Sequence, residues 1–481
     1  MMDTHIYRLR STKQLLAGFE ELEAQQIYFC PPGDLNDPVE GFKDLLWAGD
    51  TIVWRNFLKH YVLCLLHVAP ACFAGGADFD RSVLRNLVFA VPDELPPTPL
   101  RTIYARVVEA FLNDAAVERF VELMAARTTP IRRNELTHYL RSLHALALSA
   151  VFKEFEDHGL NLFRPGTVMP NQEALRKNAI AMMEAASKLP AVKPELNATE
   201  AYFSASEATV GQLDLIAEYG LTDRAATRPM QFFCRYYPPS YVDALDRLVH
   251  PDWYVACFSA NPTNASMWGS YGDGHRGVGL KFRTTPNDAG SPALRLNRVT
   301  SLGGGKGDHV YGWSFVPHEF HEVKYSVRHP EIDFFRSLGA VSLMNLNHFW
   351  YLGDNGEFSS CRQTAFHDQG AKDEYWMTFQ ESALVKTSEW AHEKEYRLVL
   401  HSGFDIREKP MRALEYKFED LVGVIFGART DIEDKLEVMR IIDRKCAREH
   451  RSDFEFWEVR YSNPDAKFNL AKLDLLKIKH E

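Results

Sequence analysis

The segment WAHEKEYRLVL, residues 390–400, is a strand-like run that carries charged side chains at alternate positions. A strand points alternate side chains to the same face. One face would therefore carry Glu393, Glu395, Arg397 and Val399, and the other Lys394, Tyr396, Leu398 and Leu400. The second set is predicted to face the core. The first set is then either a solvated surface with a Glu–Arg pair or part of a site.

The composition is that of a globular protein, with 46% hydrophobic and 25% charged residues. A chain of 481 residues predicts two domains or one enlarged domain. Its formal net charge of −10 gives no general attraction to nucleic acid, so such a contact would need a local basic patch. The seven cysteines are scattered singly, which favours reduced thiols in a cytosolic protein.

No membrane segment or signal peptide is predicted. The most apolar early stretch, YVLCLLHVAPACFAGG, is interrupted by His67 and Pro70 and is too short to span a bilayer. The start of the chain, MMDTHIYRLRST, lacks the apolar stretch of a signal peptide. We therefore expect a cytoplasmic protein that does not enter a membrane.

The chain divides into three zones by pattern. Residues 1–50 contain the strand-like HIYRLR and QIYFCP around a helix-like STKQLLAGFEELEAQ, and Asp37-Pro38 followed by Glu40 has the pattern of a helix start. Residues 51–250 repeat apolar positions at helical spacing. Residues 251–481 return to strands, with a final helix from about 430. These patterns predict an α+β protein with a mixed or antiparallel sheet from both chain ends and a large helical insertion.

The densest cluster of chemically informative residues is CFSANPTNASMWGSYGDGHRGVGLKF, residues 257–282. A buried strand is predicted to end at Ser259, followed by a short helix that places Trp268 and Tyr271 on one side. Glycines flank His275 in a tight loop. Gly277 and Gly279 leave one strand face bare, which indicates close approach of a ligand or another backbone. A structural aromatic wedge and a binding loop both fit this pattern.

Four blocks of the sequence resemble a bacterial family known as domain of unknown function twenty-nine seventy-one. They are Asn36-Asp37-Pro38, the run Ser259…Met267-Trp268-x-x-Tyr271-x-x-x-His275-x-Gly277, VKTSEWAHEKEYRLV at 385–399, and VIFGARTD at 424–431. The stretch of about 60–240 matches none of the blocks, which is why it is treated as an insertion. The family implies no established activity.

The chain also resembles, more weakly, the toxin-type ADP-ribosyltransferases. That family has a split antiparallel sheet, an Arg or His on an early strand, a Ser, Thr or Tyr on a middle strand, and a late Glu, often as Glu-x-Glu. The matching positions are Arg8, Ser259 or Tyr271, and Glu393-Lys394-Glu395. The residues ANPT follow Ser259 where those enzymes have a Ser-Thr-Ser pattern.

This resemblance implies NAD as a substrate and assigns a role to each candidate residue. Cleavage of the nicotinamide–ribose bond passes through an oxocarbenium-like state that a carboxylate stabilises. The implied catalytic residues are Glu395, Glu393, which positions or activates the acceptor, and His275 near the same pocket. The implied NAD-binding residues are Arg8, which clamps the pyrophosphate, Ser259, Trp268 and Tyr271, with aromatic stacking on nicotinamide, and Arg397, which holds a carboxylate or phosphate.

Three functions are compatible with these patterns. The first is an NAD-using effector, a bacterial toxin or anti-phage defence component, with a protein or nucleic-acid acceptor. The second is a non-enzymatic sensor or assembly module that binds a partner through its helical zone. The third is a metal-dependent nuclease, although no histidine or cysteine spacing matches a metal motif.

Overall fold

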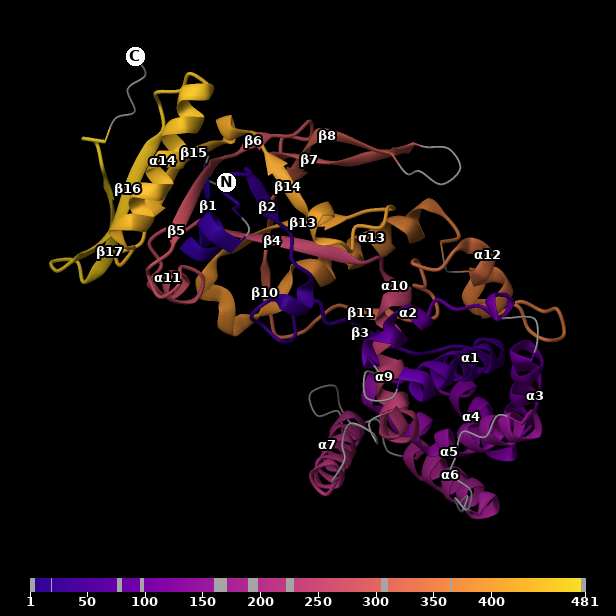
Figure 1. Ribbon diagram of the computed structural model, residues 1–481. Coiled ribbons are helices and arrows are strands. Elements are labelled where there is room, and N and C mark those ends of the chain that lie inside the picture. Colours follow the sequence, from indigo (N-terminus) through magenta and orange to yellow (C-terminus); the bar gives the residue numbers. More distant parts are fainter. Residues whose placement is uncertain are drawn as a thin grey trace. The chain divides into compact units, whose positions relative to one another are not determined.

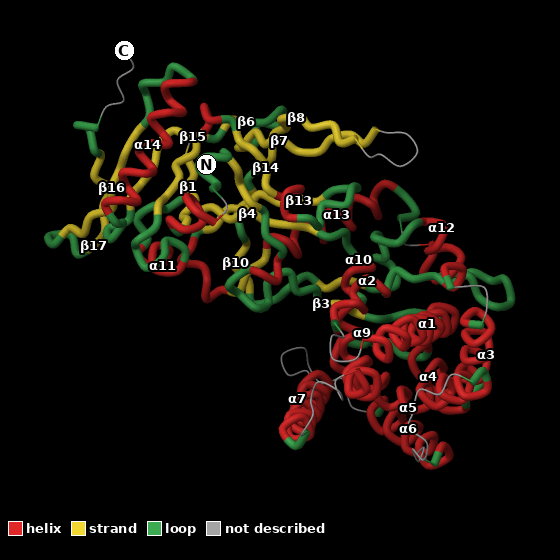
Figure 2. The backbone as a smooth tube through the Cα atoms, viewed as in Figure 1, coloured by secondary structure: helices red, strands yellow, loops and turns green. Residues whose placement is uncertain are grey.

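The computed structural model describes residues 5–18, 20–75, 80–95, 99–159, 171–188, 198–221, 229–303, 310–363 and 366–476. The chain forms two compact units. The sheet unit comprises Met1–Phe42, Asp252–His329 and Gln380–Glu481, and the helical unit comprises Lys43–Pro251 and Pro330–Phe379. Figures 1 and 2 show strands concentrated in the first unit and helices in the second.

The sheet unit is built on an eight-stranded mixed sheet with the order β17-β16-β15-β5-β1-β4-β13-β9. The strands are β1 (His5–Arg10), β4 (Trp253–Ser259), β5 (Val278–Arg283), β9 (His321–Glu322), β13 (Glu395–His401), β15 (Leu421–Phe426), β16 (Glu455–Ser462) and β17 (Lys467–Lys472). Only the β15–β16 pair within this order is parallel. Because β1 comes from one chain end and the other strands from the second half, the predicted α+β class and the pairing of both chain ends are confirmed.

Smaller sheets and three helices complete the sheet unit. The second sheet contains β2 (Gln26–Tyr28), β14 (Ala413–Tyr416), β7 (Pro292–Gly303), β6 (Thr285–Pro286) and β8 (Val310–Glu319), and β10 (Lys324–Ser326) pairs with β12 (Val385–Thr387). The helices are α11 (Ala265–Ser270), α13 (Gln369–Leu384), which begins in the helical unit, and α14 (Ile432–Arg448). In Figure 1, α14 runs alongside β15 and β16.

The helical unit is a bundle in which α1 and α5 are buried along most of their length and α4 buries one face. Its elements are α1 (Thr51–Gly75), α2 (Leu84–Leu87), α3 (Leu100–Leu112), α4 (Ala115–Ala125), α5 (Arg133–Asp157), α6 (Gln172–Ser187), α7 (Ala198–Tyr219), α9 (Tyr237–Ala244), α10 (Asp246–Val249) and α12 (Leu343–Asn345), with the strands β3 (Asp44–Leu46) and β11 (Glu331–Asp333). In α4, for example, Val117, Phe120, Val121 and Met124 are buried at helical spacing, and Asp114 caps the first turn.

Two helices predicted for the N-terminal zone are wrong. Within the described residues of 11–25, the helix is a short π-helical segment, Lys13–Gly18, and Glu20 adopts a left-handed φ of 51° that does not continue a right-handed helix. Asp37 begins a turn in place of a helix, and its Oδ1 accepts a hydrogen bond from Val39 N at 3.1 Å. The turn directs Glu40 toward Arg397, so this carboxylate pairs with a cation and does not act as a helix cap.

The close approach predicted at Gly277 is confirmed as backbone packing. A Cβ at Gly277 would lie 2.2 Å from the carbonyl oxygen of Arg10 and 2.9 Å from that of Gly272. At Gly279 the neighbours are the side chains of Leu9, Ile425 and Trp268, at 3.2–3.6 Å. Glycine at 277 therefore allows the loop after α11 to lie against the end of β1.

We expect Gly277→Ala to lower the free energy of unfolding by about 3 kcal/mol, because the added methyl group meets backbone that cannot move aside. Gly269→Ala on the exposed side of α11 is the matched control, since no atom lies within 4 Å of the added Cβ. Gly269→Ala should raise or lower the free energy of unfolding by no more than about 1 kcal/mol. Urea denaturation followed by circular dichroism measures both, and equal midpoints for the two variants would contradict this account of the loop.

Candidate functional site

The candidate site is a cavity at the place where β1 and β4 separate. All six residues of β1 pair with β5, whereas the register between β1 and β4 places Tyr7 opposite Ser259. Further along β4, Val255 pairs instead with Cys30. A strand that leaves its neighbour after one pair opens a gap in the sheet. Here the gap is part of a cavity of about 520 Å³.

The cavity wall brings together residues from three distant parts of the sequence, 7–36, 255–273 and 393–409. The wall is formed by Tyr7–Ser11, Gln14, Tyr28, Cys30, 34–36, Val255–Ser259, Met267, Ser270, Tyr271, Asp273, Glu393, Glu395 and Lys409. Five of the residues singled out in the sequence are among them. They are Arg8, Ser259, Tyr271, Glu393 and Glu395. Glu393 and Glu395 therefore border the same cavity as Tyr271, although they are more than 120 residues away in the sequence.

Arg8 presents a buried cation to this cavity. Its side chain is 4% exposed, one terminal nitrogen donates to Tyr28 O at 2.9 Å, and the guanidinium lies 5.4 Å from the centre of the Phe258 ring. The Nε atom is buried without a hydrogen-bond partner among the described residues. Burial lowers the pKa of Arg8 to about 10, so the group stays charged at neutral pH. An unsatisfied buried donor on a cation favours an anionic ligand.

The charged face of the 393–399 segment is buried and forms an ionic cluster. Its members are Glu40, Lys386, Glu393, Glu395 and Arg397, and none of their side chains is more than 3% exposed. Lys386 Nζ lies 2.7 Å from Glu393 and 3.1 Å from Glu395. Arg397 lies 2.6 Å from Glu40 and 2.8 Å from Glu395. A solvated surface is therefore excluded for this face.

Three carboxylates meet two cations, which leaves one formal negative charge when all five groups are ionised. Burial acts to raise the pKa of Glu395, but Arg397 and Lys386 outweigh it and hold this pKa at about 2. Burial raises the pKa of Glu40 against the opposing effect of Arg397. Glu395 therefore stays ionised at neutral pH while it borders the cavity.

Two hydrogen bonds fix the other carboxylate and the middle strand. Tyr271 donates its hydroxyl to Glu393 Oε1 at 2.8 Å, and burial raises the pKa of this phenol. Ser259 Oγ donates to the carbonyl oxygen of Glu393 at 3.0 Å. Ser259 also pairs with Glu395 across β4 and β13. The loop after α11 and the end of β4 therefore determine where both glutamates lie.

Three of the predicted site residues do not line the cavity. Trp268 is fully buried against Ile425 and Val459, and its indole N–H donates to Pro262 O at 2.7 Å. His275 has a left-handed φ of 71°, and its ring lies 5.2 Å from that of Phe468. Arg397 is fully buried in the ionic cluster. Trp268 and His275 therefore pack against neighbouring side chains and do not face the cavity. Arg397 forms ion pairs with Glu40 and Glu395.

Sequence reasoning missed Glu40 and Lys386. Lys386 lies on β12 inside the block VKTSEWAHEKEYRLV, where a lysine that directly follows the apolar run ALV could have indicated a buried partner for the glutamates. Glu40 carried no comparable signal, because the Asp-Pro-x-Glu pattern fits a helix cap equally well. Its role depends on a contact with a residue 357 positions away.

Across the described ranges, no group of three or more His, Cys, Asp or Glu side chains is arranged to hold a metal ion. None of the helices in the described part of the chain combines the length and the apolar character needed to cross a bilayer.

Part of the chain matches a known protein family. Residues 267–398 match the family described as "Protein of unknown function (DUF2971)", which confirms the family resemblance drawn from the sequence. The matched range contains Tyr271, Lys386, Glu393, Glu395 and Arg397, and so covers most of the ionic cluster. No curated protein and no solved structure matches the chain.

Replacement of Lys386 by Met should lower the free energy of unfolding by about 3–5 kcal/mol, because it leaves buried carboxylates without a cation. Lys324→Met on the neighbouring strand β10 is the matched control. Lys324 is 61% exposed and pairs with an exposed Glu381, so its loss should cost less than about 1 kcal/mol. The urea denaturation midpoint measures both. A Lys386 variant as stable as the Lys324 variant would show that the cluster is hydrated.

The depressed pKa of Glu395 predicts a specific acid dependence of stability. A carboxyl group with a folded pKa of about 2 and an ordinary value of 4.5 stabilises the fold above pH 4.5 and loses this contribution as the pH falls toward 2. The loss amounts to about 3 kcal/mol. The difference in stability between wild type and Glu395→Gln should therefore narrow over this range in urea titrations. A constant difference would mean that Glu395 does not titrate in this window.

Proposed function

We propose that this member of the DUF2971 family cleaves the nicotinamide–ribose bond of NAD in the cavity between β1 and β4 and transfers ADP-ribose to an acceptor. One observation carries the proposal. Arg8 of β1, Ser259 of β4 and Glu395 of β13 come from three neighbouring strands and border a single cavity, in the order that the resemblance to ADP-ribosyltransferases implies.

The carboxylate pair suits the charge that develops in this reaction. When the bond from ribose C1′ to nicotinamide breaks, its electron pair leaves with nicotinamide and C1′ becomes cationic. Glu395, which Arg397 and Lys386 keep ionised at neutral pH, supplies a fixed negative charge at this cavity. A preorganised carboxylate in a desolvated site stabilises such a cation more than water does. Glu395 is therefore assigned to the ribose side of the substrate.

The other end of the cavity suits the pyrophosphate. Arg8 offers a buried N–H donor without a partner among the described residues, and Lys409 adds a second cation to the wall. Charge-assisted hydrogen bonds from guanidinium to phosphate are among the stronger polar contacts in proteins. A dinucleotide that extends from Arg8 to Glu395 would satisfy both ends.

Completion of the reaction needs an acceptor and a base. A nucleophilic atom of the acceptor forms the new bond to C1′, and its proton must move to a base on the enzyme or to water. Glu393 borders the cavity beside Glu395 and is held by Tyr271 and Lys386, which fits a group that positions the acceptor. The acceptor is a protein or a nucleic acid. Modification of either would suit a toxin or an anti-phage defence component.

The direct test is release of nicotinamide from NAD by the purified full chain, with transfer followed by labelled NAD. Glu395→Gln should lower the rate by about 10²–10³-fold, since it removes the charge that stabilises the transition state. Glu389→Gln is the matched control, because Glu389 is exposed in the turn before β13 and does not line the cavity. Circular dichroism verifies that both variants fold. Absence of NAD turnover with every acceptor tested, or full activity of Glu395→Gln, would refute the proposal.

A second candidate function is favoured by one surface feature. Helix α7 exposes the large apolar side chains of Leu213, Leu215, Ile216 and Tyr219. Leu213 and Ile216, Leu215 and Tyr219, and Ile216 and Tyr219 are each three or four residues apart and so neighbour one another on the helix. Such a surface favours the partner-binding module considered from the sequence. A partner-binding module gives no reason for the burial of Glu393, Glu395 and Arg397.

A further inference from the structure

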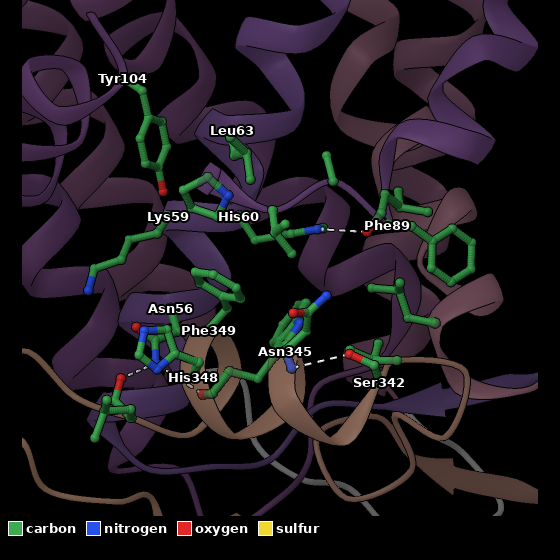
Figure 3. Close-up of a pocket in the computed structure, with 18 of the residues that line it drawn as sticks. Asn56, Lys59, His60, Leu63, Phe89, Tyr104, Ser342, Asn345, His348 and Phe349 are labelled. Atoms are coloured by element: carbon green, nitrogen blue, oxygen red, sulfur yellow. Dashed lines mark hydrogen bonds between the residues drawn. The ribbon is translucent and has the colours of Figure 1, made fainter. Parts of the chain in front are cut away.

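The helical unit contains a second cavity, of about 330 Å³, that the proposed reaction does not use. It lies between α1, the segment 88–92, Tyr104 of α3 and the segment 340–354 (Figure 3). A cavity of this size falls at the lower end of the range that small-molecule sites occupy. It has room for one small ring-bearing ligand.

The walls of this cavity are largely apolar and aromatic. In Figure 3, the Phe349 side chain rises from the segment 340–354 toward α1, with Phe89 at the opposite side. Leu63 and Trp350 add buried apolar surface. Two polar side chains of the wall, His60 and Asn56, form hydrogen bonds to neighbouring protein groups and so stabilise the wall. Both ring nitrogens of His60 are within 2.8 Å of protein oxygens, and Asn56 donates to two carbonyl oxygens.

The wall also contains polar side chains without such a structural role, among them Tyr104, Asn345 and His348. The hydroxyl of Tyr104 and the side-chain amide of Asn345 make no hydrogen bond to any described residue, and both line the cavity. Burial raises the pKa of Tyr104, so the hydroxyl is a neutral donor and acceptor. The amide of Asn345 offers a donor and an acceptor side by side. This pairing matches the edge of a heteroaromatic base.

The charge beside the cavity is positive. Lys59 and Asp354 line the wall and pair with each other, and Arg55 Nε lies 3.8 Å from Asp354. Two cations thus share one carboxylate. Partly exposed cations near an apolar cavity attract an anionic substituent on a ligand whose body is buried.

We infer that this cavity binds one small molecule with a planar heteroaromatic ring and an anionic substituent, which is the chemistry of a nucleoside monophosphate. The ring packs against Phe349 and Phe89, and its polar edge meets Asn345 and Tyr104. The anionic group lies toward Lys59. The site stands whether or not the protein cleaves NAD, since it shares no residue with the cavity between β1 and β4.

Calorimetric titration of the full chain with AMP, GMP, CMP and UMP, and with the corresponding nucleosides, tests this inference. At least one monophosphate should bind with a Kd below about 1 mM, and its nucleoside should bind at least about tenfold more weakly. Asn345→Ala and Tyr104→Phe should each weaken that binding by about tenfold. Met344→Ala is the matched control, since Met344 lies on the same short helix, is 77% exposed and does not line the cavity.

A further variant distinguishes binding in this cavity from binding in the cavity between β1 and β4. Arg8→Lys alters the cavity between β1 and β4 and should leave monophosphate binding unchanged. The inference is overturned if no monophosphate binds, if the nucleosides bind as tightly as the monophosphates, or if Asn345→Ala and Met344→Ala behave alike. Loss of binding in Arg8→Lys alone would assign the monophosphate to the first cavity and would likewise overturn it.

Discussion

Two cations and three carboxylates lie together inside the sheet unit, away from water, and the candidate site is arranged around them. Burial of each charge costs free energy, and only close pairing offsets that cost. Lys386 connects Glu393 to Glu395, and Arg397 connects Glu395 to Glu40. These contacts join β12, β13 and the turn after β2. The cluster therefore holds together segments from both chain ends and at the same time fixes the carboxylates that border the cavity.

The same cluster gives the cavity its electrostatic asymmetry. The ionised carboxylate of Glu395 lies on β13, and the buried cation Arg8 lies on β1. The separation of β1 from β4 places a gap between these two groups. A substrate that is cationic at one reacting centre and anionic elsewhere fits this arrangement better than a uniformly charged one. NAD in the act of losing nicotinamide has this character.

Much of the sheet unit could be predicted from sequence, for a physical reason. Strands such as LVGVIF and WYVACFS are short, apolar and rich in β-branched or aromatic residues, so local pattern determines them. The alternation correctly placed Glu395 and Arg397 on one face of β13, whereas Glu393 lies in the turn before the strand and Lys394, predicted to face the core, is exposed with a left-handed φ of 45°. Burial of that face could not be predicted, because it depends on Lys386 and Glu40, whose contacts are set by tertiary packing.

Trp268 and His275 were predicted to belong to the site, but neither lines the cavity. Aromatic and imidazole side chains in a glycine-rich loop serve packing as readily as binding, and local sequence does not distinguish the two.

The central claim is that one cavity, bounded by Arg8 on one strand and Glu395 on another, holds a dinucleotide whose ribose faces the acidic side. A crystal structure of the protein with an NAD analogue whose nicotinamide–ribose linkage cannot be cleaved tests this most directly. The account predicts that the ribose hydroxyls lie within hydrogen-bonding distance of Glu395 and that the pyrophosphate contacts the Arg8 guanidinium. An analogue bound elsewhere on the chain, or bound here with its pyrophosphate against the carboxylates, would contradict it.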